Sequence, residues 1–356
     1  MIDCDIHPQI GDAEELLVHV DEAQRDWFRS QPYFGLPGYS WTHPTSWYRQ
    51  DLGSAGRPPG ADVEAVRREL LDPSGTEIGV LNADDAVLVS LMPSPYRAAA
   101  LARAHNDWIR ERWLDREPRL RGAIICPAQD PEEAAKEIRR VAEDPRFVQV
   151  LVCGGSERPY GEPRYLPIFE AASELGLPVA IHSGGEGMGL AAPPGGAGPV
   201  TFYIEWHTLG SACSTMAHLV SLLVHGTFER LPNLRLLLIE GGIAWLPGIL
   251  WRLDTNWRAL RADTPWLERK PSEVARAHVR FSTQPLEHTD GRDALLWEML
   301  EAAGAPEVLC FASDYPHWDF DDPAFLLKRL PAAWRDRVLH ENASELYGQR
   351  LAVASR

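Results

Sequence analysis

Four short apolar segments of this 356-residue chain end in side chains that are able to bind a metal ion. The first segment, at the N-terminus, ends in Asp3-Cys4-Asp5-Ile6-His7. The other three end in Ile181-His182-Ser183, in Ile239-Glu240-Gly241 and in Ser313-Asp314-Tyr315. Imidazole and carboxylate groups are the usual ligands of zinc, iron and manganese, and a catalytic site keeps one coordination position open. We therefore expect a divalent metal site.

The segments that carry these groups read as strands. Runs such as AVLVSL, GAIIC, VQVLV and LRLLLI are apolar throughout, which is typical of strands buried on both faces of a parallel sheet. Helical patterns separate them, so the alternation predicts an α/β fold, a (β/α)8 TIM barrel whose strand ends meet at one mouth. The predicted strands are 1–5, 86–91, 122–126, 148–152, 179–182, 234–240, 279–282 and 308–312.

Two intervals are too long to be simple loops. Residues 8–85 follow the first strand, and residues 183–233 follow the fifth and begin with a Gly- and Pro-rich stretch. Both follow a strand, so we expect both insertions to lie over the mouth of one barrel domain spanning residues 1–356. The aromatic residues Trp41, Trp47 and Tyr48 of the first insertion either close over a hydrophobic substrate or pack in the core or a subunit interface.

Composition excludes several classes of protein. The chain has 51 acidic residues and 35 Lys plus Arg, a net charge of −16, which argues against a nucleic-acid partner. No apolar run is long enough for a membrane span, and no signal-peptide pattern follows Met1. Five cysteines without a C-x-x-C pair suit a reducing compartment, so we expect a cytoplasmic protein. The P-loop, G-x-G-x-x-G and G-x-S-x-G patterns are all missing from the sequence.

Four sequence motifs carry a resemblance to a known family. They are the opening D-x-D-x-H, then I-H-S-G-G, then F-A-S-D-Y-P-H-W-D-F-D-D-P, and finally E-N-A-S-E-L-Y-G. Together they resemble the amidohydrolase superfamily, and more narrowly its amidohydrolase-2 branch. That branch holds aminocarboxymuconate-semialdehyde decarboxylase, resorcylate-type decarboxylases and lactone hydrolases. The resemblance extends from Ile2 to Gly348.

The resemblance implies a ligand set. The H-x-H pair of the family falls on Asp5 and His7, and its later ligands fall on His182 and Asp314. Asp314 would also orient or deprotonate a metal-bound water, whose pKa such an ion lowers to about 7. We expect zinc, with iron or manganese as alternatives, and one ion rather than two, because the fourth strand ends without the bridging residue of binuclear relatives. The branch is often dimeric, which leaves a homodimer open.

Glu240 departs from the pattern of the branch. Decarboxylases of the branch usually carry a histidine at this position, so the glutamate argues against decarboxylation. Glu240 is either a further metal ligand, or a general acid or base, or a supporting residue.

Two further histidines belong to the expected site. His207, at the start of a predicted helix near the mouth, is a catalytic candidate on the substrate side, with a surface or packing role as the alternative. His317, three residues after Asp314, is expected to support the site rather than to bind metal.

These residues predict a metal-dependent hydrolase in which activated water attacks a small carboxylic acid derivative, whether ester, lactone, amide or thioester. Asp314 and Glu240 would handle the proton or assist the leaving group. The first alternative is non-oxidative decarboxylation of an aromatic or muconate-like acid. The second, from another class, is a barrel that binds a ligand without catalysis.

Overall fold

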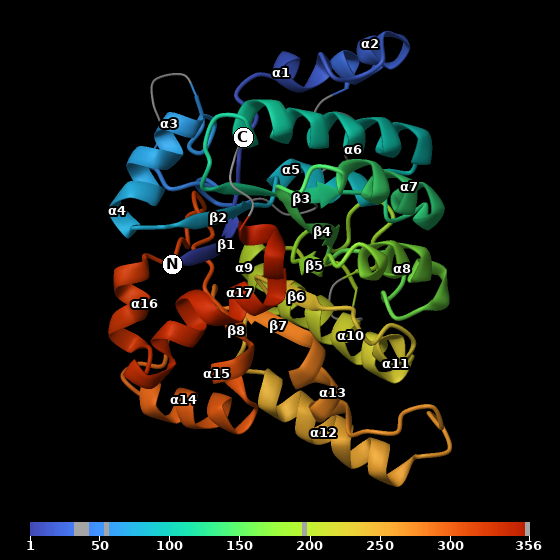
Figure 1. Ribbon diagram of the computed structural model, residues 1–356, viewed down its shortest axis with the longest axis vertical. Helices are drawn as coiled ribbons and strands as arrows, with labels where there is room; N and C mark the ends of the chain where they lie inside the picture. Colours follow the sequence, from blue (N-terminus) through green and yellow to red (C-terminus); the bar gives the residue numbers. More distant parts are fainter. Residues whose placement is uncertain (32–42, 53–56, 194–197, 353–356) are drawn as a thin grey trace.

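The central element of the computed structural model, which describes residues 1–31, 43–52, 57–193 and 198–352, is a parallel sheet. Each of its eight strands pairs with the next along the chain, in the order β1 to β8. Figure 1 shows the strands in the middle of the molecule with helices around them. The strands are β1 (Ile2–Ile6), β2 (Ile78–Leu81), β3 (Leu120–Ile125), β4 (Phe147–Cys153), β5 (Val179–His182), β6 (Leu236–Ile239), β7 (Val279–Ser282) and β8 (Leu309–Cys310).

Backbone hydrogen bonds connect the first strand, β1, to the residues that follow the last strand, β8. The amide of Cys4 donates to the carbonyl of Phe311 at 2.9 Å, and the amide of His7 donates to the carbonyl of Tyr315 at 2.7 Å. These bonds close the sheet, and the predicted (β/α)8 barrel is confirmed. Closure also brings the N-terminal strand beside the segment that contains Asp314.

Helices cover the outer surface of the strands. Two of them begin at a proline preceded by an aspartate: the side chain of Asp130 caps α7, and that of Asp322 caps α16. The α-helices are α1 (Ala13–Leu17), α2 (Glu22–Ser30), α3 (Val63–Val66), α4 (Asp72–Ser74), α5 (Asp84–Val87), α6 (Pro95–Ile109), α7 (Pro131–Val141), α8 (Leu166–Glu174), α9 (Tyr203–Glu205), α10 (Ser211–Val224), α11 (Thr227–Arg230), α12 (Leu246–Ala259), α13 (Pro271–His278), α14 (Asp293–Ala302), α15 (Ala305–Val308), α16 (Pro323–Arg329) and α17 (Asn342–Tyr347). Within the described residues, none of the helices is both long and apolar enough to span a membrane.

The second strand does not lie where the apolar pattern predicted it. Residues 86–91 are helical, in α5 and in the 3₁₀ turn Leu88–Leu91, whereas β2 is Ile78–Leu81. A short apolar run fits a buried helical turn as well as a buried strand, because both exclude water on all sides. The correction shortens the first insertion and places Asn82 and Asp84 directly after a barrel strand, where functional side chains gather.

Candidate metal centre and substrate pocket

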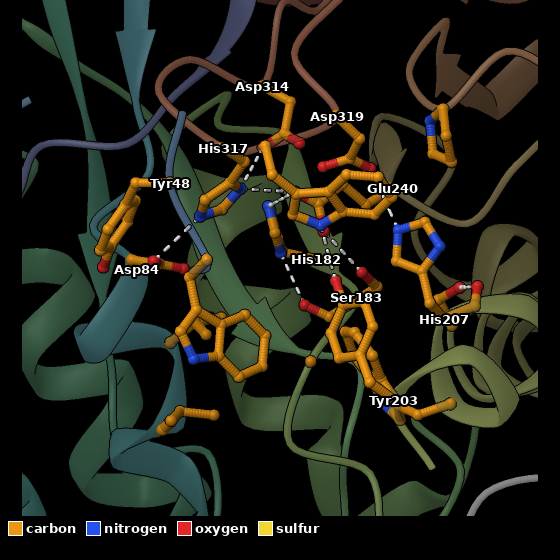
Figure 2. Close-up of a pocket in the computed structure, with 18 of the residues that line it drawn as sticks. Tyr48, Asp84, His182, Ser183, Tyr203, His207, Glu240, Asp314, His317 and Asp319 are labelled. Atoms are coloured by element: carbon orange, nitrogen blue, oxygen red, sulfur yellow. Dashed lines mark hydrogen bonds and ion pairs between the residues drawn. The ribbon is translucent and has the colours of Figure 1, made fainter. Parts of the chain in front are cut away.

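The carboxyl ends of β1, β5 and β6 and the segment after β8 bring the five predicted ligands into two overlapping groups, part of which Figure 2 shows. One group is Asp5, His7, His182 and Glu240, and the other is His7, Glu240, Asp314 and His317. Nε2 of His182 lies 3.5 Å from Oδ2 of Asp5 and 3.3 Å from Oε1 of Glu240. Nε2 of His7 lies 3.0 Å from Oδ1 of Asp314 and 3.5 Å from Oε1 of Glu240. Three carboxylates and two imidazoles therefore meet in a buried cluster.

The cluster has the chemistry of a cation site. Oδ2 of Asp5, Nε2 of His7, Nε2 of His182 and Oε1 of Glu240 are buried, yet none of them makes a well-aligned hydrogen bond. Donor atoms of these four residues lie within 4.8 Å of one another. A buried polar atom left without a partner costs about 1–3 kcal/mol, and one divalent cation would satisfy all four atoms. The donors present fit a divalent metal.

An uncommon backbone conformation at Glu240 and Asp314 orients their carboxyl groups. Glu240 has a φ of 55° and Asp314 a φ of 59°, in the left-handed region that non-glycine residues seldom adopt. The amide of Glu240 donates to Oγ of Ser282 at 3.1 Å, and the amide of Asp314 donates to the carbonyl of Asp5 at 3.1 Å. Such a conformation costs about 1–3 kcal/mol and is found most often at functional sites.

Neighbouring groups orient the ligands. Nδ1 of His182 lies 2.7 Å from the carbonyl oxygen of Ser183, which leaves Nε2 facing the cluster. The hydroxyl of Ser183 donates to Oε2 of Glu240 at 2.8 Å. Nδ2 of Asn82 donates to Oδ1 of Asp5 at 2.7 Å. In each case one side of the ligand is fixed and the other side is left for the metal.

His317 and Asp84 extend the cluster toward the pocket wall. Nδ1 of His317 contacts Asp314, and its Nε2 lies 3.0 Å from Oδ2 of Asp84 (Figure 2). Asp84 and Asn82 were missed from the sequence because the second strand was assigned to residues 86–91. Two polar residues soon after the apolar run Ile-Gly-Val-Leu were the available signal.

Two carboxyl groups of the cluster have opposite protonation preferences. Burial and the nearby charge of Glu240 raise the pKa of Asp314 well above its usual range. Burial also acts to raise the pKa of Glu240, but the charge of His182 and hydrogen bonds from the histidines outweigh it and hold that pKa well below its usual range. Of the two carboxyl groups, Asp314 is therefore the one that holds a proton more readily, and Glu240 is the one that ionises more readily.

A cavity of about 530 Å³ opens above the cluster, and Glu240, Asp314 and His317 form part of its floor. Its volume suits a small organic molecule. Of the three aromatic residues expected over the mouth, Trp47 and Tyr48 line it, while Trp41 lies outside the described residues. Other apolar walls come from Val87, Leu88, Met188, Tyr203, Trp206 and Trp318.

His207 also lines the cavity but does not belong to the metal-binding cluster. Its Nε2 lies 3.0 Å from Oδ2 of Asp319, and Figure 2 shows it across the pocket from His317. Nε2 of Gln284 donates to Oδ2 of Asp319 at 3.1 Å and to Oδ2 of Asp314 at 2.8 Å. His207 therefore reaches Asp314 only through two other side chains, and its catalytic role stays a prediction.

A family model described as amidohydrolase matches residues 2–349, nearly the whole length of the chain. The chain belongs to the amidohydrolase family. Members resembling it are enzymes, and this one is an enzyme as well, so the interpretation as a non-catalytic binding barrel is wrong.

Several of the similar proteins are decarboxylases. A gamma-resorcylate decarboxylase of Rhodococcus jostii is 28% identical over 324 residues, which cover 83% of this chain and 93% of that protein. A dihydroxybenzoic acid decarboxylase structure from Polaromonas sp. JS666, with bound manganese and the inhibitor 2-nitroresorcinol, has a TM-score of 0.67 at 20% identity, covering 98% and 96% of the two chains. A 5-carboxyvanillate decarboxylase structure from Sphingomonas paucimobilis has a TM-score of 0.67 at 23% identity, covering 98% of each chain.

These relatives contradict the prediction of a hydrolase, since they point to the alternative of decarboxylation. The prediction failed because the same imidazoles and carboxylates hold a metal for either reaction, and because a glutamate in place of the usual histidine at position 240 does not by itself exclude decarboxylation. Zinc is not confirmed either, and the Polaromonas structure contains manganese. Imidazole and carboxylate ligands accept both ions, so the ligand types alone do not separate them.

Proposed function

We propose that this enzyme catalyses the non-oxidative, metal-dependent decarboxylation of a small aromatic carboxylic acid. The observation that carries the proposal is the buried carboxylate and histidine cluster at the floor of a pocket walled by aromatic side chains. Flat aromatic side chains favour a flat aromatic ligand, because stacked and edge-to-face ring contacts add to the burial of apolar surface. The similarity to gamma-resorcylate decarboxylases supports the same reaction.

In this proposal, Asp5, His7, His182, Asp314 and Glu240 hold one divalent ion, with manganese preferred over zinc. When bound, the ion supplies the positive charge that holds and orients the substrate carboxylate. Glu240 suits the role of ligand better than that of proton donor, because its pKa lies well below the usual range.

Asp314 is the proposed proton donor. The ring carbon that bears the carboxylate takes the proton of Asp314. The bond between that carbon and the carboxylate then breaks, its electron pair returns to the ring, and carbon dioxide leaves. Water reprotonates Asp314 afterwards. A buried carboxyl group with a raised pKa suits this step, since it keeps a proton at a pH where an exposed aspartate is ionised.

His317 holds the proton donor in place. Its Nδ1 contacts Oδ1 of Asp314 while Gln284 donates to Oδ2, so both oxygens of the carboxyl group are fixed. His207 and Asp319 lie on the far wall and are proposed to contact ring substituents of the substrate. The single domain, the homodimer and the cytoplasmic location remain predictions.

The test is product analysis. Manganese-loaded protein is incubated with 2,6-dihydroxybenzoate and with other hydroxybenzoates that carry one carboxylate, and the decarboxylated phenol and carbon dioxide are measured. We expect carbon dioxide in equal amount to the phenol, and none with the Asp314→Asn variant. A fully metal-loaded protein that releases no carbon dioxide from any of these acids would contradict the proposal.

A further inference from the structure

A line of buried side chains runs from the C-terminal helix to the metal cluster. The hydroxyl of Tyr347, in α17, donates to Oε1 of Gln149, in β4, at 2.9 Å. Nε2 of Gln149 donates to Oδ1 of Asn82, directly after β2, at 2.7 Å. Nδ2 of Asn82 in turn donates to Oδ1 of Asp5, in β1, at 2.7 Å. Three hydrogen bonds thus cross the barrel interior.

The direction of these bonds is uniform. At every link the donor lies on the side of α17 and the acceptor on the side of the metal cluster. An amide such as Asn82 can present either its NH₂ or its carbonyl group to a neighbour. Here the NH₂ of Gln149 donates to the side-chain carbonyl of Asn82. The NH₂ of Asn82 donates both to Asp5 and to the backbone carbonyl of Cys4, 3.1 Å away. A reversed Asn82 would place its carbonyl against the carboxylate of Asp5.

Water does not substitute for these partners. Asn82 is 1% exposed, Gln149 0% and Tyr347 2%, so each bond lies in an interior of low polarity. Hydrogen bonds there have larger electrostatic consequences than bonds in water, and a misdirected amide is more costly. The chain therefore holds Asn82 in one orientation.

The fixed orientation of Asn82 determines which oxygen of Asp5 accepts its hydrogen bond. Oδ1 of Asp5 accepts from Asn82 and lies 3.3 Å from Nε2 of His7, whereas Oδ2 lies 3.5 Å from Nε2 of His182 and is the oxygen without a well-aligned hydrogen bond. We infer that Asn82 is a positioning residue for Asp5, and that Gln149 and Tyr347 act through Asn82 to present Oδ2 of Asp5 to the metal. This inference rests on Asp5 being a metal ligand, and it is independent of which reaction follows.

The experiment measures metal binding without substrate. Protein stripped with a chelator is titrated with Mn²⁺ alone, and free Mn²⁺ is followed by electron paramagnetic resonance. Loss of an outer partner of a metal ligand typically weakens metal binding by about 10–100-fold, and we expect this for Asn82→Leu. Tyr347→Phe, which removes only the first hydroxyl of the line, should weaken binding by a smaller factor of about 3–10 on the same scale.

Tyr160→Phe is the matched control. Tyr160 is also 2% exposed, and its hydroxyl donates to the carbonyl of Cys153 at 2.7 Å, outside the line to Asp5. Both tyrosine variants lose one buried hydroxyl, so their thermal midpoints should fall similarly, while only Tyr347→Phe should weaken Mn²⁺ binding. Equal Mn²⁺ affinity in the two variants would overturn the role of Tyr347.

A folded Asn82→Leu protein that binds Mn²⁺ as tightly as the wild type would overturn the role of Asn82. If Asn82→Leu does not fold, the comparison of the two tyrosine variants still decides. Because the titration contains no substrate, a wild-type protein that binds Mn²⁺ but releases no carbon dioxide would contradict the proposed function and leave this inference standing.

Discussion

Nδ1 of His317 lies 2.5 Å from Oδ1 of Asp314, while Nε2 of the same ring lies 3.0 Å from Oδ2 of Asp84. The imidazole thus lies between two acidic groups, one buried at the metal cluster and one partly exposed at the pocket wall. Burial acts to lower the pKa of His317, but interactions with Asp314 and Asp84 outweigh it and raise that pKa well above its usual value. The ring in this position holds the carboxyl group of Asp314 at the pocket.

Replacement of the proposed proton donor is the most direct mechanistic prediction. Asp314→Asn should keep the fold and lower kcat by about 100-fold or more, since a positioned proton donor contributes roughly 10²–10⁴-fold. Carbon dioxide release under saturating Mn²⁺ and substrate checks this. Asp319→Asn is the comparison, because Asp319 shares the Gln284 donor but lies on the substrate wall, so its replacement should raise KM and have a much smaller effect on kcat. An active Asp314→Asn enzyme would remove Asp314 from the mechanism.

Glu240 is predicted to act through the metal. Glu240→Gln should lower the bound Mn²⁺ measured by elemental analysis after gel filtration, because a neutral amide oxygen is a weaker ligand than a carboxylate. Ser183→Ala, which removes only the hydrogen bond to Oε2 of Glu240, should lower the metal content less than Glu240→Gln does. Full metal content in Glu240→Gln together with lost turnover would instead assign Glu240 to proton transfer.

Metal removal should abolish activity reversibly. The cluster combines three carboxylates with histidines, and without a divalent cation the carboxylates would repel a substrate carboxylate. Chelator-treated protein is expected to release no carbon dioxide, and added Mn²⁺ should restore release more fully than added Zn²⁺. Activity that survives chelation, with metal absent by elemental analysis, would disprove metal dependence.

The charge of the pocket predicts a preference among substrates. Lys and Arg are absent from the described residues that line the cavity, and Asp84 and Asp319 line its walls. Among the residues outside the described ranges, Arg356 is the one Lys or Arg in the sequence. A second carboxylate on the ring would meet Asp84 or Asp319 without a Lys or Arg of the described lining to balance it, so kcat/KM should fall by about 10-fold or more relative to the monocarboxylate. Equal kcat/KM for a matched pair, such as a hydroxybenzoate with and without a second carboxylate, would contradict this.

Acid should destabilise the fold partly through His218. Burial lowers the pKa of His218 to about 4. The neutral ring accepts a hydrogen bond from the amide of Tyr160 and lies 2.7 Å from the carbonyl oxygen of Gly154. The pKa of histidine in the unfolded chain is about 6.5, so the unfolded state binds the proton first as pH falls. This contribution is complete above about pH 6.5 and is lost progressively down to about pH 4.

Urea unfolding at pH 7.0 and at pH 4.5 measures this loss. The decrease in the free energy of unfolding between the two pH values should be smaller for His218→Gln than for the wild type. Equal decreases would show that His218 does not contribute to acid sensitivity.

The residues of the site that lie at strand ends could be predicted from the sequence. Asp5, His182, Glu240 and Asp314 each follow an apolar run, and this signal holds even when a boundary is off by two residues. Asn82 and Asp84 were missed because one apolar run, 86–91, was assigned as a strand in place of 78–81. Burial on all sides makes a helical turn and a strand look alike, and only tertiary packing separates them.

The contacts that orient the proposed ligands could not be predicted from the sequence for another reason. Gln149, Gln284 and Tyr347 reach the cluster through bonds between residues far apart in the chain, such as the 198-residue separation of Gln149 and Tyr347. No local spacing encodes such pairs. The chemistry was also undetermined, because hydrolysis and decarboxylation call for the same ligand types.

Closure of the barrel by β1 and the segment after β8 sets an order of events during synthesis. Asp5 and His7 leave the ribosome first, but Asp314, whose amide donates to the carbonyl of Asp5 at 3.1 Å, emerges more than three hundred residues later. The proposed five-residue centre is therefore complete only after translation has passed Asp314. A prematurely terminated chain that lacks this segment keeps three of the ligand-bearing strands and is unable to complete the centre.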